Sequence, residues 1–204
     1  MASFSLVHGA WHGGWAWDRV RGELETRGHD VAAPDLPCDD VSSGIADYAR
    51  CVAPADVAVG HSLGGLTIAR VDARVRVYLC ALVPGVDDSD AFVSGFGGSR
   101  TRDELGRSYY PDPADGAREL QYPDGALELA RRLRPQAPIP FQPELPSGRS
   151  VYVVCTRDAA IAPDWQRRAA AAIGAEVVEL DAGHSPMLTH APELADLLER
   201  YAAS

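Results

Sequence analysis

Short β-branched runs alternate with helical stretches along most of the chain. Six runs have the length and composition of strands, and they cover residues 4–8, 31–33, 57–59, 75–81, 151–155 and 177–180. Helical stretches lie between or after them, at residues 17–28, 45–52, 63–73, 163–174 and 191–203. Apolar strands that alternate with helices indicate a parallel sheet covered on both faces. We therefore predict an α/β fold with a mostly parallel, doubly wound sheet of about six strands.

One long segment, between Pro84 and Ser150, breaks this alternation, and we expect no strand in it. It is rich in Gly and Pro and carries the aromatic residues Phe92, Phe96, Tyr109, Tyr110, Tyr122 and Phe141. A capping box, Thr101-x-x-Glu104, predicts one short helix, and residues 124–135 predict another. Because the segment is long and aromatic, we interpret it as a small lid over the strand ends. The prediction is one domain over residues 1–204 with a lid insertion at about 85–148.

Composition and charge exclude several classes of protein. The net charge of −10 argues against nucleic acid and anionic membranes as partners. No apolar run approaches the length of a membrane span, and the N-terminus lacks the features of a signal peptide. The four cysteines show no C-x-x-C spacing and no cluster with histidine, which favours a cytoplasmic location and no metal.

The segment VAVGHSLGGL, residues 57–66, places Ser62 between glycines directly after an apolar run. The five residues from Gly60 to Gly64 fit the pattern G-x-S-x-G, with a predicted strand before them and a predicted helix after them. This context is typical of a nucleophile elbow, whose tight turn requires small neighbours. We predict that Ser62 is a nucleophile, and the alternative is an ordinary strand-to-helix turn.

A base and an acid follow the last two predicted strands. In ELDAGHSPMLTHAPELADLL, His184 lies in the loop after a strand, and imidazole titrates near neutral pH. In VYVVCTRDAAIAPDW, Asp158 lies just beyond the preceding strand, where a carboxylate can orient the His184 ring. The chain order Ser, Asp, His is the one expected after this elbow. Asp87, Asp88 and Asp181 remain alternatives for the acid.

The first predicted strand ends in His8-Gly9-Ala10, where backbone N–H groups can stabilise an oxyanion. We assign the oxyanion donors as the N–H groups of Ala10 and Leu63, and we expect His8 to structure the loop through hydrogen bonds. A strand order of 2-1-3-4-5-6 would place Ala10 and Ser62 together at the topological switch point. The substrate pocket is predicted to include Trp11, Phe92, Tyr109, Tyr110 and Met187.

Several motifs together resemble the α/β-hydrolase superfamily, in the branch of plant methyl esterases and hydroxynitrile lyases. They are VHGAWHGGWAWDRV, VAAPDLP, GHSLGG, LRPQAPIPF and AGHSPMLTHAPELADLL, and the resemblance covers nearly the whole chain. The resemblance implies an α/β-hydrolase fold and a triad of Ser62, Asp158 and His184. It also implies oxyanion donors at Ala10 and Leu63, and no cofactor.

The leading hypothesis is a serine hydrolase, an esterase that cleaves a small ester, lactone or thioester through an acyl-enzyme. The lyases of this branch carry a threonine and a lysine where this chain has Gly9 and Ser185, and the sequence contains no lysine. A carbon–carbon lyase of the hydroxynitrile type and a binding protein without turnover are the alternatives. The expected partner is a small-molecule substrate, and a homodimer is compatible with the sequence.

Overall fold

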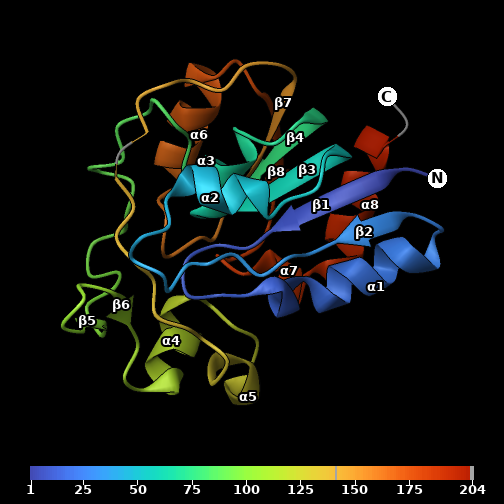
Figure 1. Cartoon of the computed structure of the whole chain (residues 1–204). Helices are drawn as coiled ribbons and strands as arrows, with labels where there is room; N and C mark the ends of the chain where they lie inside the picture. Colours follow the sequence, from blue (N-terminus) through green and yellow to red (C-terminus); the bar gives the residue numbers. More distant parts are fainter. Residues whose placement is uncertain (141, 203–204) are drawn as a thin grey trace.

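The computed structural model describes residues 1–140 and 142–202. Phe141, one of the predicted lid aromatics, and the last residue of the predicted helix at 191–203 lie outside the described residues. Within the described residues, six parallel strands form the main sheet, in the order β2-β1-β3-β4-β7-β8 (Figure 1). The strands are β1 (Ser3–Val7), β2 (Asp30–Ala32), β3 (Ala55–His61), β4 (Ala73–Leu79), β7 (Ser150–Cys155) and β8 (Glu176–Leu180). The predicted strands and their order are therefore confirmed.

Helices cover both faces of this sheet, as predicted (Figure 1). The short 3-10 helix η1 (Gly14–Trp17), α1 (Asp18–Thr26), α7 (Pro186–Thr189) and α8 (Ala191–Ala202) pack on one face. The helices α2 (Ile45–Arg50), α3 (Gly64–Ile68) and α6 (Pro163–Ala172) pack on the other. Alternate residues of β3 serve the two layers, since Val57 packs in the first and Ala58 in the second.

Helix α3 is shorter than the predicted stretch at residues 63–73. It ends at Ile68, because the chain must turn there to enter β4 at Ala73. The side chain of Arg76 stabilises this end of the helix. Its Nε donates to the carbonyl of Ile68 at 3.0 Å, and its Nη2 donates to that of Val71 at 2.7 Å.

The segment between β4 and β7 differs from the prediction in its strands and in its helices. It contains an antiparallel pair of strands, β5 (Thr101–Arg102) and β6 (Ser108–Tyr109), where no strand was expected. The helix predicted from Thr101 and Glu104 is wrong, because the Asp103 carboxylate accepts the N–H groups of Leu105 and Arg107 and closes a turn.

Two further helices of this segment also differ from the prediction. The predicted helix at 124–135 is reduced to α5 (Leu127–Ala130), and the helix α4 (Pro113–Glu119) was missed. The sequence carried a signal for α4, because Asp112 accepts the N–H of Ala114 at 2.8 Å and Pro113 occupies the first turn.

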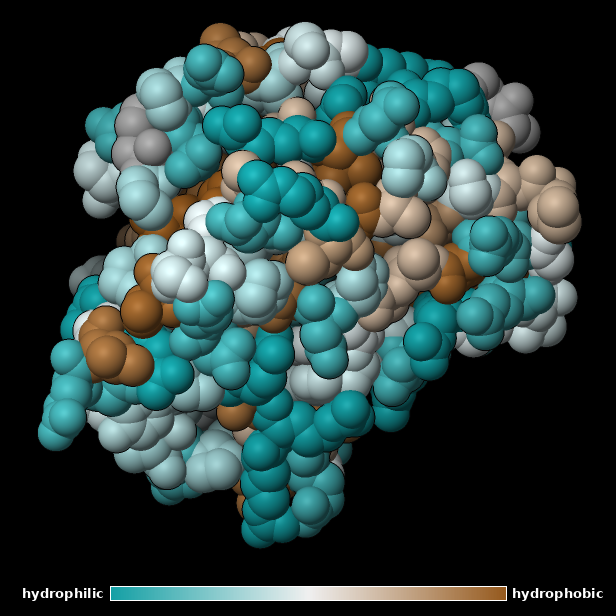
Figure 2. Space-filling view, in the orientation of Figure 1, coloured by the Kyte–Doolittle hydropathy of each residue, from teal (hydrophilic) through white to brown (hydrophobic). Residues whose placement is uncertain are grey.

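Most of the face shown in Figure 2 is hydrophilic, and hydrophobic residues appear on it as separate patches. The large apolar residues with more than a third of their surface exposed are Met1, Val41, Phe92, Leu105, Leu127, Leu145 and Val177. In the described part of the chain, no helix is both long enough and apolar enough to cross a bilayer.

Helix α3 packs directly on the backbone of its neighbours because it begins with two glycines. A Cβ on Gly64 would lie 2.7 Å from the carbonyl oxygens of Val7 and His8. A Cβ on Gly65 would lie 2.2 Å from the carbonyl oxygen of Leu82. These neighbours are backbone atoms, which cannot move aside as the end of a flexible side chain can.

We predict that Gly65→Ala lowers the free energy of unfolding by about 1–3 kcal/mol, because the added methyl group overpacks this contact. The matched control is Gly22→Ala in α1, where a Cβ would meet nothing within 4 Å. That change should raise the free energy of unfolding by roughly 0.5–1 kcal/mol, because alanine favours a helix interior over glycine. Urea denaturation measures both, and equal shifts for the two variants would contradict the packing argument.

Candidate active site

Ser62 lies in a tight turn between β3 and α3, with a backbone φ of 51°. This left-handed conformation is strained for a residue with a side chain, as in a nucleophile elbow. Hydrogen bonds hold the turn on both sides, since the Ser62 N–H donates to Leu79 and the Ser62 carbonyl accepts from Leu82. The loop after β1 comes equally close, because a Cβ on Gly9 would lie 2.8 Å from that of Ser62. The geometry fixes the serine side chain at the carboxyl ends of β1 and β3.

The structure brings the three predicted triad residues into one chain of hydrogen bonds. The Ser62 Oγ lies 3.2 Å from Nε2 of His184, and Nδ1 of the same ring lies 2.8 Å from Oδ2 of Asp158. All three residues are buried, with His184 only 1% exposed. In this arrangement the serine hydroxyl can donate to Nε2 while Nδ1–H donates to the carboxylate.

The Asp158 carboxylate is held by several donors of its own loop and of α6. Its Oδ1 accepts the N–H groups of Ala160 and Ile161, at 2.7 and 2.9 Å. Its Oδ2 accepts the Gln166 side-chain amide at 3.0 Å, in addition to the His184 ring. These hydrogen bonds fix the orientation of the Asp158 carboxylate beside the imidazole.

The alternative acids lie elsewhere. Asp181 is largely exposed and forms an ion pair with Arg157 at 2.7 Å. The Asp87 carboxylate accepts the N–H of Ser89 at 2.9 Å. Asp88 lines the cavity beside Ser62. Of the four candidates, all within the described ranges, only Asp158 is hydrogen-bonded to His184.

Gln121 joins the loops that carry the acid and the base, and it belongs to no sequence motif that could have identified it. Its Oε1 accepts the N–H of Ala159 at 2.7 Å and that of His184 at 2.9 Å, and its Nε2 donates to the carbonyl of Arg157 at 3.0 Å. Gly183 leaves the necessary room, since a Cβ there would lie 2.7 Å from Nε2 of Gln121. The segment between β4 and β7 is therefore attached directly to both loops.

Buried histidines structure the surroundings of the site. The Nε2 of His8 accepts the N–H of Leu36 at 3.0 Å, so His8 orders its loop as predicted. His12 links the carbonyl of Ala10, at 2.7 Å from Nδ1, to the hydroxyl of Tyr122, at 2.8 Å from Nε2.

His61, Cys80 and His184 bring ligand-type atoms within 4.8 Å of one another. The side chains of His61 and Cys80 both donate to the carbonyl oxygen of His184, at 2.7 and 3.6 Å. Burial raises the pKa of the Cys80 thiol well above its usual value, whereas a metal needs the thiolate. These side chains therefore support the backbone of His184.

Both residues predicted to supply oxyanion donors lie beside the nucleophile. Ala10 and Leu63 line the same cavity as Ser62. Neither N–H group forms a hydrogen bond with any part of the chain that the structure describes. Backbone donors beside a buried serine are usually paired, so two unpaired ones are suited to receive a developing negative charge.

The cavity at Ser62 has a volume of about 200 Å³ and a mostly apolar lining. Trp11 and Phe92 line it, as predicted, and Phe96, Leu82 and Ile139 contribute further apolar surface. Phe96 was expected only among the lid aromatics, because nothing in the sequence indicates which aromatic side chains point inward.

Three predicted pocket residues do not line this cavity. Tyr109 follows Ser108, which does line it, and successive residues of a strand face opposite sides. Tyr110 is buried beneath Trp11, with ring centroids 5.5 Å apart. Met187 is fully buried in the core under α7. The prediction is wrong for Tyr110 and Met187 because both side chains pack against other side chains in the interior.

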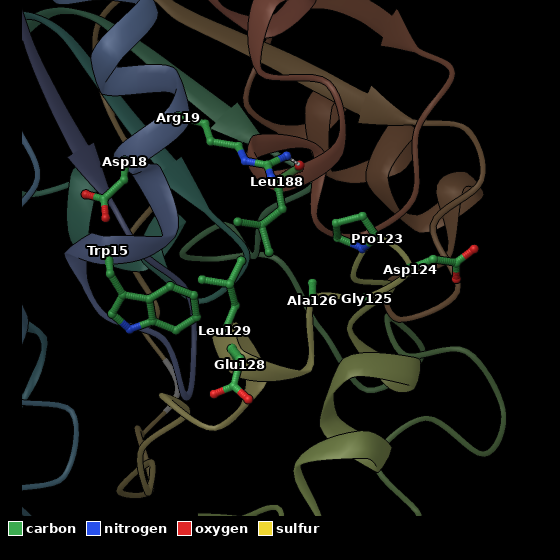
Figure 3. A pocket seen from close by; sticks show the side chains of 10 residues that line it. All are labelled: Trp15, Asp18, Arg19, Pro123, Asp124, Gly125, Ala126, Glu128, Leu129 and Leu188. Atoms are coloured by element: carbon green, nitrogen blue, oxygen red, sulfur yellow. Dashed lines mark hydrogen bonds between the residues drawn. The ribbon is translucent and has the colours of Figure 1, made fainter.

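A larger cavity of about 400 Å³ lies between η1, α1 and α5 (Figure 3). Trp15, Leu129 and Leu188 form its apolar wall, and Arg19 donates to the carbonyl of Leu188 at 2.8 Å (Figure 3). None of the three triad residues lines it, so we place the active site at the smaller cavity.

Comparison with known proteins identifies the family. The pattern of the Alpha/beta hydrolase family matches residues 6–197. The chain belongs to this family. It is similar to two Arabidopsis thaliana proteins. Methylesterase 3 is 28% identical, covering 95% of this chain and 93% of the relative, and Methylesterase 9 is 30% identical, covering 99% of this chain and 98% of the relative. The crystal structure of a pyrethroid hydrolase from Sphingobium faniae JZ-2 has a TM-score of 0.82 at 22% identity, covering 99% of this chain and 97% of that one, which shows the shared fold.

The buried histidines of the hydrolase make its stability depend on pH. Burial lowers the pKa of His8 to about 4 and that of His12 to about 3. In the unfolded chain a histidine has a pKa near 6.5, so the unfolded state binds more protons as the pH falls below this value. Acid therefore favours unfolding before either ring can be protonated in the folded protein.

We predict that the free energy of unfolding falls by ~2 kcal/mol for each of these histidines between about pH 7.5 and about pH 5. Urea denaturation across this range measures the change. In the variant His12→Gln, the free energy of unfolding should fall by ~2 kcal/mol less than in the wild type over the same pH range, because one buried histidine is missing. The same pH dependence in both proteins would mean that His12 is not kept neutral by folding.

Proposed function

We propose that this hydrolase cleaves a small carboxylic ester through an acyl-enzyme on Ser62, with lactones and thioesters as substrates of the same chemistry. The observation that carries the proposal is the continuous hydrogen-bonded chain from Ser62 through His184 to Asp158. A serine hydroxyl alone is a weak nucleophile, and an adjacent oriented base makes it reactive.

The geometry supports the following sequence of steps. The Oγ of Ser62 attacks the carbonyl carbon while its proton passes to Nε2 of His184, and Asp158 stabilises the resulting imidazolium. The N–H groups of Ala10 and Leu63 stabilise the oxyanion of the tetrahedral intermediate. When the ester C–O bond breaks, His184 returns the proton to the leaving alcohol. Water then attacks the acyl carbon while its proton passes to His184. The acyl–Oγ bond breaks, His184 returns the proton to Ser62, and the carboxylic acid is released.

The relatives and the cavity support a small substrate. Two similar proteins are named methylesterases, so we propose a small alcohol such as methanol as the leaving group. The cavity of about 200 Å³, with aromatic walls, suits short or aromatic acyl groups.

A hydroxynitrile-lyase activity lacks comparable support. Cyanide release calls for a fixed cation beside the catalytic histidine. Ser185 stands at that position, and its hydroxyl donates to the carbonyl of Leu120 at 2.5 Å. Arg157, from the loop beside His184, forms an ion pair with Asp181.

We predict that a fluorophosphonate labels the enzyme once, at Ser62, and that Ser62→Ala abolishes both labelling and ester hydrolysis. The reason is that, among the residues the structure describes, the Ser62 hydroxyl is the only one hydrogen-bonded to His184. Mass spectrometry of the labelled protein and a panel of methyl and aryl esters provide the measurements. Labelling that persists in Ser62→Ala would refute the assignment. Cyanide release from mandelonitrile without hydrolysis of any ester would instead favour the lyase.

We predict that Asp158→Asn lowers kcat by several orders of magnitude, about 10⁴-fold in the comparable change in a serine protease, because the amide stabilises the wrong imidazole tautomer. Asp181→Asn is the matched control, since this acid follows β8 and contacts Arg157 instead of His184. Its kcat should stay close to that of the wild type. A greater loss in Asp181→Asn than in Asp158→Asn would transfer the role to Asp181.

A further inference from the structure

Arg100 extends into the cavity that holds Ser62, although most of that lining is apolar. Its guanidinium carbon lies 4.6 Å from the ring centroid of Trp11 and 5.2 Å from that of Phe96, and both rings line the same cavity. Its Nε donates to the carbonyl of Gly97 at 3.3 Å. Contacts with ring faces stabilise the cation but use none of its N–H donors.

Within the described part of the chain, the Arg100 guanidinium has no carboxylate partner. Among residues 1–140 and 142–202, no Asp or Glu forms an ion pair with Arg100, and neither Nη group has a hydrogen-bond acceptor. Glu119, the last residue of α4, already accepts the N–H groups of Gly97 and Ser99 and the hydroxyl of Tyr110. Asp88 also lines the cavity and lies beyond ion-pair distance from Arg100.

A second cavity adjoins the cavity at Ser62 beside Arg100, and a second arginine lines it. Its volume is about 510 Å³, it shares Arg100 and Ser108 with the cavity at Ser62, and it is also lined by Thr101 and Arg102. The Arg102 Nη1 donates to the carbonyl of Gly106 at 2.9 Å, and this guanidinium also has no ion pair in the described ranges. Two such cations along one cleft are notable in a chain with a net charge of −10.

We propose that Arg100 binds a carboxylate on the substrate, so that the preferred substrates are esters that carry a second, anionic carboxyl group. The inference rests on the proposed ester hydrolysis and specifies its substrate class. A guanidinium offers paired donors that match the two oxygens of a carboxylate. The rings of Trp11 and Phe96 would hold the guanidinium in place before the ligand arrives, which reduces the entropy cost of binding.

The test compares esters that differ only in a carboxylate and its uncharged carboxamide. Monomethyl terephthalate and methyl 4-carbamoylbenzoate place the difference on the acyl part. The pair 4-acetoxybenzoate and 4-acetoxybenzamide places it on the alcohol part. For one of these pairs, the wild type should show a kcat/KM roughly 10- to 100-fold higher for the carboxylate, the range expected for one charge-assisted hydrogen-bonded pair.

Variants assign the preference to Arg100. Arg100→Gln should reduce the ratio of the two kcat/KM values to about one, and because it is a ratio, any general loss of activity cancels. Arg132→Gln is the matched control, because Arg132 also lies over a tryptophan, at 4.9 Å from the ring of Trp15, but away from the cavity at Ser62. This control should keep the ratio of the wild type.

A measurement on the wild type alone covers the case in which Arg100→Gln does not fold. Raising the salt concentration should lower kcat/KM for the carboxylate ester and leave that of the carboxamide nearly constant, because salt screens the charge pair. Hydrolysis of the carboxamide esters with no preference for a carboxylate, or a preference that Arg100→Gln retains, would overturn the inference and leave the proposed function intact. If no ester is hydrolysed and no fluorophosphonate labels Ser62, the proposed function fails, and this inference fails with it.

Discussion

The strained turn at Ser62 is the constraint on which the rest of the site depends. A positive φ at a serine persists only when the surrounding structure holds it there. Here the support is close backbone packing, since a Cβ on Gly60 would lie 2.6 Å from the carbonyl oxygen of Gly64. The same closeness brings the loop after β1 against Ser62, so that Ala10 and Leu63 flank the nucleophile. One packing arrangement thus positions the nucleophile and both proposed oxyanion donors.

The segment between β4 and β7 is part of this arrangement and also lines the cavity. Gln121 connects the loop of Asp158 to the loop of His184 through three hydrogen bonds. Leu120, the preceding residue, accepts the Ser185 hydroxyl through its carbonyl and packs in a small cluster with Trp11 and Tyr110. A movement of this segment would therefore displace both the cavity wall and the loops that carry Asp158 and His184. Changes to it should alter turnover as well as substrate choice.

The sequence predicted the parts of the molecule that depend on periodicity and local turns. Strand order, the elbow at Ser62, and the positions of Asp158 and His184 after their strands all follow from local pattern and the rules of parallel sheets. Tertiary packing decides the rest. The capping-box pattern at Thr101 predicted a helix, but the Asp103 carboxylate closes a turn there. Met187 was predicted to line the pocket, but its side chain packs in the core. Gln121 carries no sequence signal, because its role arises only when three loops distant in sequence meet.

The electrostatics around His184 are consistent with the proposed mechanism. The mechanism requires His184 to become an imidazolium, and a second cation in contact with it would oppose that step. The ring of His61 lies 4.8 Å from that of His184, so its charge state matters directly. Burial lowers the pKa of His61 well below its usual value, and the nearby His184 lowers it further. His61 therefore stays neutral and supports the backbone of His184, while the Asp158 carboxylate supplies a charge of the sign that stabilises the imidazolium.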